Sequence, residues 1–228
     1  TVLSTPSLDR LFAQSLRLTD FHVSPTCAPT RAALMTGRYN NRAGVWHTVM
    51  GRSILRRDEK TMADYFSDAG YRTGYFGKWH LYGGDRVRPI PPGEYRYGFD
   101  NDFLSNNCTT LFDKESAYYW DAGGKKQLYG DWEPYAQTRQ AMQFLDQAKS
   151  AEPFAMFVSW HPPHSWRGPE SYPAPPELMS KYDPASITLR GNCEDTPERR
   201  KAYSGYMAMC TSIDTCVGWL TRKLKEVG

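Results

Sequence analysis

The spacing of hydrophobic residues predicts that helices and strands alternate along this chain. Residues 60–69 have the three- and four-residue spacing of an amphipathic helix that ends at Gly70, and residues 71–76 follow as a strand. The same order returns where a helical pattern over 135–149 precedes the near-continuous apolar run FAMFVSW at 154–160, which is typical of a strand buried on both faces. This alternation predicts an α/β fold with a mostly parallel central sheet flanked by helices.

Three further elements follow from the same patterns. Residues 6–16 place apolar side chains on one stripe of a helix, and residues 19–23 alternate as a short strand does. Residues 198–227 carry apolar side chains at three- and four-residue steps, which predicts a long helix. Asp214 lies within that helix, and we expect its carboxylate to lie on the helix surface.

Two segments have the composition of loops. Residues 81–132 are weakly periodic and rich in Gly, Pro, Tyr and Asn. Because so long a bare loop is unusual in a compact domain, we expect short strands or irregular excursions over the sheet there. Residues 165–197 are polar and Pro-rich and predict a surface loop with a short turn near 176–182.

The composition predicts one sizeable domain and argues against some classes of function. The chain has 228 residues and a net charge of +3, with basic and acidic residues interleaved, which argues against a nucleic-acid-binding surface. We expect the densest basic run, residues 52–57, to be a solvated loop or the entry to a helix rather than a binding patch. No apolar segment approaches the roughly 18 residues of a membrane span. The sequence does not begin with a signal peptide, so the protein is either cytoplasmic or has a leader outside this sequence. We expect the second, which implies a periplasmic, secreted or lysosome-like location.

The run CAPTRAALMTGR at residues 27–38 contains the strongest candidate chemistry. Its apolar positions favour a helix that begins near Cys27, with Thr26 or a neighbouring residue as N-cap and Gly37 at its end. Free backbone N–H groups and the positive end of the helix dipole then converge at Cys27, and Arg31 lies one turn further along the same face. These features predict an anion site beside a sulfur-bearing side chain.

From its surroundings alone, Cys27 has two interpretations. It could be a reactive thiol, activated by the helix start and Arg31 as in a phosphatase or a redox protein, or it could be a small buried side chain. The chain has five cysteines and none has metal-ligand spacing. This odd count fits one cysteine used in chemistry and four that are free or paired.

The same run resembles the signature of the sulfatase family, in which Cys or Ser, then Pro, then Arg at alternate positions precede Thr-Gly-Arg. The residues that match are Cys27, Pro29, Arg31, Thr36, Gly37 and Arg38. The resemblance implies that a formylglycine-generating or anaerobic sulfatase-maturing enzyme oxidises Cys27 to formylglycine. One hydroxyl of the formylglycine hydrate then attacks the sulfur of a sulfate ester, and the other expels sulfate and restores the aldehyde.

Two later motifs also match the family. The run GKWH at 77–80 follows a predicted strand, and the resemblance implies that Lys78 and His80 hold a sulfate oxygen and the formylglycine hydrate. In the run HPPH, it implies that His164 contacts sulfate and protonates the leaving oxygen, while His161 is a supporting or substrate-edge residue. Other candidates for contact with the organic part of the substrate are Trp46, His47 and Trp166.

The resemblance extends over essentially all 228 residues, but over only about the middle half of a usual sulfatase. It implies an alkaline-phosphatase-like fold, incomplete at both ends, with residues 1–228 as one partial catalytic domain. It also implies a Ca²⁺ ion, held by formylglycine at position 27 and by Asp and Asn side chains outside this sequence. We therefore expect a fragment that is nearly inactive alone, because Ca²⁺ neutralises the sulfate and activates the hydrate.

These observations predict a calcium-dependent sulfatase that hydrolyses the sulfate ester of a sugar or an aryl compound. A phosphonate or phosphate monoester hydrolase of the same superfamily is an alternative, since some of these enzymes share formylglycine. A catalytically inactive relative that serves as a binding or structural module is a second alternative, because the implied metal ligands are not in the sequence.

Overall fold

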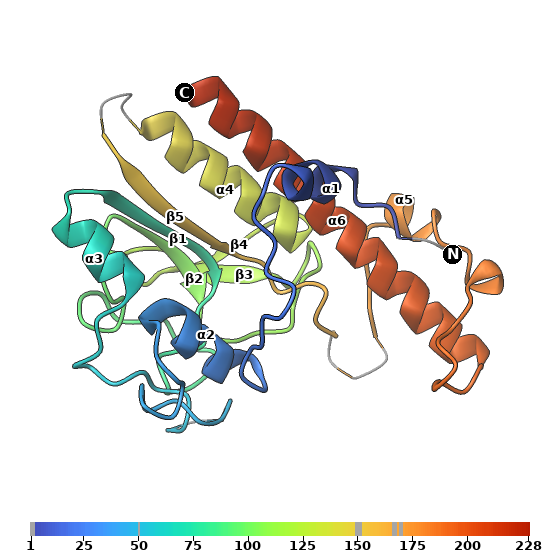
Figure 1. Ribbon diagram of the computed structural model, residues 1–228, viewed down its shortest axis with the longest axis horizontal. Helices are drawn as coiled ribbons and strands as arrows, with labels where there is room; N and C mark the ends of the chain where they lie inside the picture. The colour runs from blue at the N-terminus through green and yellow to red at the C-terminus, as the bar shows by residue number, and fades with distance from the viewer. Residues whose placement is uncertain (1–2, 50, 149–151, 166–167, 169–170) are drawn as a thin grey trace.

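The computed structural model describes residues 3–49, 51–148, 152–165, 168 and 171–228, and its centre is a five-stranded sheet. Strands β2, β1 and β5 are parallel, and β3 and β4 continue the sheet antiparallel, in the order β4-β3-β2-β1-β5 (Figure 1). The strands are β1 (Arg72–Lys78), β2 (Asp102–Asn106), β3 (Tyr118–Trp120), β4 (Lys126–Leu128) and β5 (Phe154–Ser159). The predicted α/β class with parallel central strands is confirmed, although the sheet as a whole is mixed.

Helices pack on both faces of this sheet (Figure 1). Because successive side chains of a strand point to opposite faces, Tyr75 of β1 packs with residues of α2 and α3, whereas Phe76 packs with Phe144 of α4 and Leu220 of α6. Both β1 side chains are at most 1% exposed, so hydrophobic layers on either side hold the strand. The helices are α1 (Pro6–Ala13), α2 (Cys27–Thr36), α3 (Met62–Asp68), α4 (Glu133–Gln147), α5 (Pro176–Met179) and α6 (Pro197–Val227), with a short 3₁₀ turn, η1 (Pro184–Ser186).

Strands β1 and β5 approach closely where both end, at the pair Gly77 and Ser159. Gly77 has φ +110°, and a Cβ atom built there would lie 2.2 Å from the Ser159 carbonyl oxygen. Only glycine fits both the backbone conformation and the space. The close approach brings Lys78, the next residue, to the same carboxyl edge of the sheet as Ser159, which is where α/β folds place their sites.

The structure corrects three predictions about secondary structure. Residues 19–23 form no strand, and their side chains are exposed, including Phe21 at 64% and Val23 at 63%. Helix α1 ends at Ala13 rather than at residue 16. Strand β5 is mostly half-buried rather than buried on both faces, because β1 is its one strand neighbour in the described sheet.

Asp214 is buried, which contradicts its predicted place on the helix surface. Its side chain is on α6 and is 4% exposed, and its Oδ1 atom accepts hydrogen bonds from the backbone N–H groups of Ser7 at 2.9 Å and Leu8 at 2.8 Å. These two N–H groups belong to the first turn of α1, which has no partner for them within the helix. Asp214 therefore caps α1 from a residue more than 200 positions away in the sequence.

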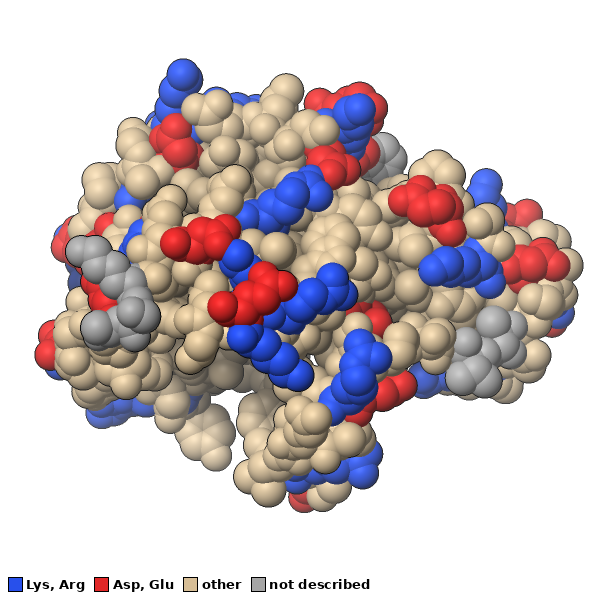
Figure 2. Space-filling view, turned by 90° about the horizontal axis from the view of Figure 1, so that it is seen from above, with Lys and Arg blue, Asp and Glu red and all other residues tan. Residues whose placement is uncertain are grey.

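The face of the molecule in Figure 2 carries Lys and Arg side chains interspersed with Asp and Glu. Within the described ranges, no helix is long and apolar enough to cross a membrane. All five cysteines lie in the described part of the chain and are free thiols. Trp166, a predicted substrate contact, lies outside the described residues.

Candidate active site

Cys27 is the first residue of α2 and is partly exposed. The preceding residue, Thr26, has φ +68° and its side chain makes no capping hydrogen bond, so the predicted N-cap is wrong. A left-handed conformation is costly for a β-branched residue, and such strain concentrates at functional sites. The first backbone N–H groups of α2 therefore have no side-chain acceptor from Thr26, as an anion site at a helix start requires.

Arg31 connects α2 to the ends of two strands. Its Nη1 atom donates hydrogen bonds to the Lys78 carbonyl oxygen at 2.8 Å and to the Ser159 Oγ atom at 2.6 Å. The Tyr75 hydroxyl also donates to the Lys78 carbonyl. The Arg31 guanidinium is thus held in one orientation, one helical turn from Cys27. Sequence reasoning did not identify Ser159 or Tyr75, and the serine at the carboxyl end of an apolar strand was the signal available for Ser159.

The rest of the family signature is structural. The Thr36 hydroxyl donates to the Ala32 carbonyl oxygen at 2.7 Å, and Gly37 ends α2 in a left-handed conformation with φ +67°. The Arg38 Nε atom lies 3.5 Å from a carboxylate oxygen of Glu59, whose side chain is 5% exposed. These contacts fix the end of the helix, while Cys27 and Arg31 occupy the end that faces the sheet.

His80 lies directly against Cys27. Its Nδ1 atom is 3.1 Å from the Cys27 Sγ atom, and its Nε2 atom is 3.0 Å from the Thr48 carbonyl oxygen. The residue follows β1, has φ +60°, and is 1% exposed. It therefore reaches Cys27 through a left-handed turn rather than through the regular strand geometry that the sequence suggested.

The His80 ring is neutral and its tautomer follows from its neighbours. Burial and the positive charge of Lys78 lower the pKa of His80 to about 3, although the Thr48 carbonyl acts in the opposite direction. A carbonyl oxygen can only accept, so Nε2 carries the proton and donates it to Thr48. The Nδ1 atom is left as a hydrogen-bond acceptor that faces residue 27.

Behind these residues lies a buried group that sequence reasoning missed, Glu133 at the start of α4. Its carboxylate is fully buried, and one oxygen lies 2.6 Å from Nδ1 of the buried His161. Burial raises the pKa of Glu133 well above its ordinary value, whereas the positive charge of Lys78 acts to lower it. Burial and the charge of Lys78 lower the pKa of His161 well below its ordinary value. Both directions indicate that the two side chains are neutral in the folded protein.

The remaining candidates differ in exposure. Lys78 is 3% exposed, and its ammonium group forms no hydrogen bond or ion pair with any described residue, so this group is placed to meet an anion. His164 is exposed, and its Nδ1 atom lies 2.8 Å from the Ser165 carbonyl oxygen. Trp46 is 56% exposed, and His47 is also exposed. His161 is in contact with Glu133 in the interior rather than at a surface edge.

The described residues do not by themselves fit a Ca²⁺ ion. Within the described ranges, no group of three or more His, Cys, Asp or Glu side chains could hold a metal. The side chains of Arg31 and Lys78 beside Cys27 carry positive charge, whereas Ca²⁺ takes six to eight oxygen ligands. We therefore derive no chemical step through a metal.

Comparison with known proteins agrees with the fold and the signature. The family model described as Sulfatase matches residues 1–228. An ulvan-active sulfatase from Formosa agariphila is 33% identical over 230 residues, which cover 99% of this chain and 43% of that protein. An endo-4-O-sulfatase from Bacteroides thetaiotaomicron is 28% identical over 250 residues, which cover 98% of this chain and 49% of that protein. The chain thus spans about half the length of these relatives.

A solved structure of a Bacteroides thetaiotaomicron sulfatase, from work on the metabolism of multiple glycosaminoglycans, superposes on this chain with a TM-score of 0.84 and 28% sequence identity. The match covers 99% of this chain and 51% of that one. The fold is therefore the alkaline-phosphatase-like α/β fold of sulfuric ester hydrolases. The chain belongs to the sulfatase family. Membership in this family generally implies formylglycine and Ca²⁺.

Proposed function

We propose that this chain contributes the nucleophile and most of the sulfate-binding groups of a sulfuric ester hydrolase acting on a sulfated carbohydrate or aryl ester. The observation that carries the proposal is the 3.1 Å approach of His80 Nδ1 to Cys27 Sγ, beside the guanidinium of Arg31 and the unpaired ammonium of Lys78. A nucleophile, an acceptor for its proton and two cations for an oxyanion thus meet at one helix start.

Formylglycine made from Cys27 would supply a hydrate hydroxyl for attack on sulfur and a second hydroxyl for expulsion of sulfate. Neutral His80 accepts a proton from a hydroxyl at position 27 through Nδ1, while Thr48 holds the ring in place. Lys78 and Arg31 stabilise the negative charge on the sulfate oxygens. Arg31 does so from a fixed orientation, because Lys78 and Ser159 hold its Nη1 atom.

His164 donates a proton to the leaving oxygen in this proposal. Its exposed side chain follows the end of β5 by five residues, and its backbone N–H donates to the His161 carbonyl oxygen at 3.1 Å. Trp46, His47 and Trp166 are proposed to contact the organic part of the substrate, and His161 to support the site from the interior through Glu133.

The complete protein is proposed to require Ca²⁺, conversion of Cys27 by a formylglycine-generating or anaerobic sulfatase-maturing enzyme, and a periplasmic, secreted or lysosome-like location. The first test is mass spectrometry of the Cys27 peptide after co-expression with a maturing enzyme. Formylglycine lowers the mass of the peptide by about 18 Da relative to the thiol. An unmodified thiol under these conditions would contradict the nucleophile assignment.

The second test compares the hydrolysis of nitrophenyl sulfate with that of nitrophenyl phosphate by the matured full-length protein. A kcat/KM that is higher for the sulfate by about 100-fold or more is the expected result. A preference for the phosphate would favour the alternative monoester hydrolase. Hydrolysis of neither ester by protein whose Cys27 is converted would favour a catalytically inactive binding module.

A further inference from the structure

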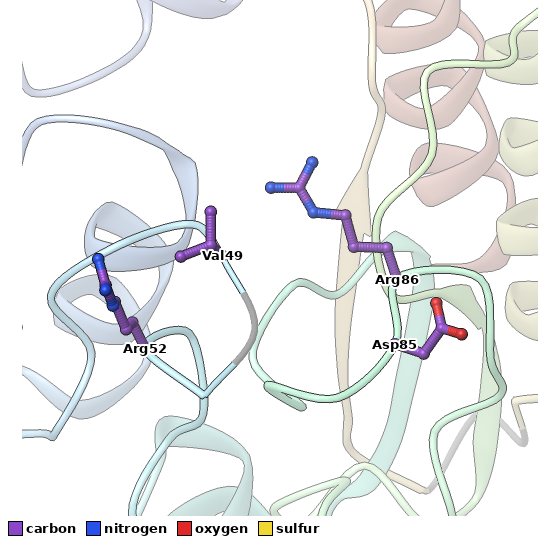
Figure 3. Close-up of a pocket in the computed structure, with 4 residues that line it drawn as sticks. All are labelled: Val49, Arg52, Asp85 and Arg86. Carbon is purple, nitrogen blue, oxygen red and sulfur yellow. The ribbon is translucent and has the colours of Figure 1, made fainter.

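A pocket of about 600 Å³ lies beside the active site and is lined by Val49, Arg52, Asp85 and Arg86 (Figure 3). This volume is in the range of pockets that hold small ligands. Arg52 and Arg86 come from two separate segments, and both are exposed. Neither guanidinium forms an ion pair with any described residue. The pocket therefore presents two cations that have no counter-charge in this part of the chain.

The acidic residue in the pocket wall does not neutralise these arginines. Figure 3 shows the Asp85 carboxylate pointing away from the Arg86 guanidinium, which extends toward Val49. An Asp85 oxygen accepts a hydrogen bond from the Val87 backbone N–H at 3.2 Å, and the other lies 3.8 Å from the Arg88 Nε atom. The positive charge that faces the pocket is thus uncompensated.

Arg52 differs from the other arginines of the basic run at residues 52–57. Arg56 forms two hydrogen bonds with Asp58, and Arg57 lies 3.2 Å from Glu94. The prediction of a solvated basic loop therefore applies to these two residues. Arg52 instead stacks on the exposed Trp46, with its guanidinium carbon 4.8 Å from the ring centroid. An aromatic ring beside a guanidinium offers a stacking surface next to a charge.

The pocket is connected to the active site through one backbone carbonyl. The Thr48 carbonyl oxygen accepts hydrogen bonds from Arg86 Nη2 at 2.7 Å and from His80 Nε2 at 3.0 Å. The other ring nitrogen of His80 contacts Cys27. One hydrogen-bonded chain thus runs from the Arg86 guanidinium to the position of the nucleophile.

The two walls of the pocket are held in a fixed relation to each other. The Gly51 N–H donates to the Gly83 carbonyl at 2.8 Å, and Ile54 and Tyr82 form an isolated β-bridge. The Cys108 N–H donates to the Arg86 carbonyl at 3.2 Å, which joins the second wall to the segment after β2. The separation of the two backbone segments that carry the arginines is therefore set before any ligand binds, which lowers the entropic cost of binding.

We propose that Arg52 and Arg86 bind a second anionic group, a carboxylate or a second sulfate, on the sulfated saccharide whose ester is cleaved at Cys27. The proposal rests on the proposed sulfatase function and specifies its substrate class as a saccharide with at least two negative charges. Guanidinium groups suit this task because they form paired hydrogen bonds with carboxylate and sulfate oxygens. Trp46, on which Arg52 stacks, provides the aromatic surface for the sugar ring in this proposal.

The test measures kcat and KM of the matured full-length protein on matched saccharides. One carries a single sulfate ester, a second adds a uronic-acid carboxylate, and a third adds a second sulfate. The key variant is Arg52→Gln, because the native Arg52 side chain makes no hydrogen bond to the groups around Cys27 in the described structure. We expect KM for at least one of the dianionic substrates to rise about tenfold with kcat unchanged, and kinetics on the singly charged substrate to stay within twofold.

Three comparisons complete the experiment. Arg52→Lys should recover part of the lost affinity because it keeps the charge, and Arg222→Gln, on the exposed side of α6, should behave as wild type. Arg86→Gln should raise KM in the same selective way and also lower kcat, since it removes a donor from the Thr48 carbonyl. The dianionic substrate with the larger effect identifies the carboxylate or the sulfate as the ligand. Equal losses on all three substrates would overturn the proposal.

A binding measurement separates this proposal from the proposed function. An unsulfated uronic-acid oligosaccharide, or the corresponding disulfated saccharide, is titrated into the Cys27→Ala protein, which binds without catalysis. We expect the additional substitution Arg52→Gln to weaken binding of at least one of these two saccharides by about tenfold. If no sulfate ester is hydrolysed but this binding is found, the proposed function fails and the anion pocket stands. If hydrolysis is found but Arg52→Gln changes neither binding nor KM, the pocket proposal fails and the function stands.

Discussion

His80 points one ring nitrogen at Cys27, with Nδ1 3.1 Å from Sγ, and uses the other to hold the Thr48 carbonyl. Because the ring is neutral, Nδ1 accepts a proton rather than donating one. We expect His80→Ala to lower kcat by about 100-fold or more while the mass shift of the Cys27 peptide is retained. Steady-state kinetics on nitrophenyl sulfate measure this effect. A variant with wild-type kcat would remove His80 from the proton transfer.

The proposed role of His164 predicts a dependence on the leaving group. A nitrophenolate leaves without help, whereas a sugar alkoxide needs a proton. His164→Gln should therefore lower kcat on a sugar sulfate by about 100-fold and on nitrophenyl sulfate by only a few-fold. The measurement is the ratio of the two rate losses. Equal losses on both esters would indicate that His164 binds sulfate but does not act as the acid.

The buried pair of Glu133 and His161 predicts how stability changes with pH. Burial raises the pKa of Glu133 in the folded protein, so above pH 4.5 the unfolded chain loses a proton that the folded chain keeps. Each further pH unit then lowers the free energy of unfolding of the wild type by up to about 1.4 kcal/mol, until the pKa of Glu133 in the folded protein is reached. Glu133→Gln does not have this cost, so its stability relative to wild type should increase as the pH is raised from 5 to 8.

Denaturant unfolding of both proteins at several pH values measures this difference. The His161 contribution has the opposite sign, since its lowered pKa reduces stability as the pH falls below 6.5, but it is present in both proteins. A difference that shrinks as the pH rises would show that Glu133 is ionised in the folded state.

Gly77 is predicted to tolerate no side chain. Gly77→Ala would place Cβ 2.2 Å from the Ser159 carbonyl oxygen at φ +110°, so we expect a loss of about 3 kcal/mol of unfolding free energy and lower activity. Gly37→Ala is the matched control, because it has φ +67° and open space around the added carbon. Gly37→Ala should lower the free energy of unfolding by about 1 kcal/mol. Equal losses for the two variants in urea unfolding would contradict the steric argument.

Asp214 is predicted to stabilise α1 from α6. Asp214→Ala removes the acceptor of the Ser7 and Leu8 N–H groups. We therefore expect the free energy of unfolding to fall by about 2 kcal/mol and hydrogen exchange at these two amides to become faster. Asp214→Asn keeps an oxygen acceptor and should lose less. Unchanged exchange at Ser7 and Leu8 in the alanine variant would show that another group caps the helix.

Elements with strong periodicity were predictable because local pattern and burial agree. The long helix predicted over 198–227 is α6 (Pro197–Val227), and the helix that starts at Cys27 is α2. The strand predicted over 19–23 is wrong because alternation alone provides no partner strand, and none pairs with these residues in the described structure. The cap predicted at Thr26 is wrong because that residue adopts a left-handed conformation on the way into α2.

The sequence by itself determined the class of protein and the helix that carries the signature, because the signature places Cys27 and Arg31 one helical turn apart and helix geometry needs no other part of the chain. Only the tertiary structure decided what surrounds them. The contact of His80 with Cys27, the pairing of Glu133 with His161, the burial of Asp214 and the pocket that Arg52 and Arg86 both line all join segments that are distant in the sequence. Such contacts depend on how the sheet and its helices pack, which no local pattern of residues specifies.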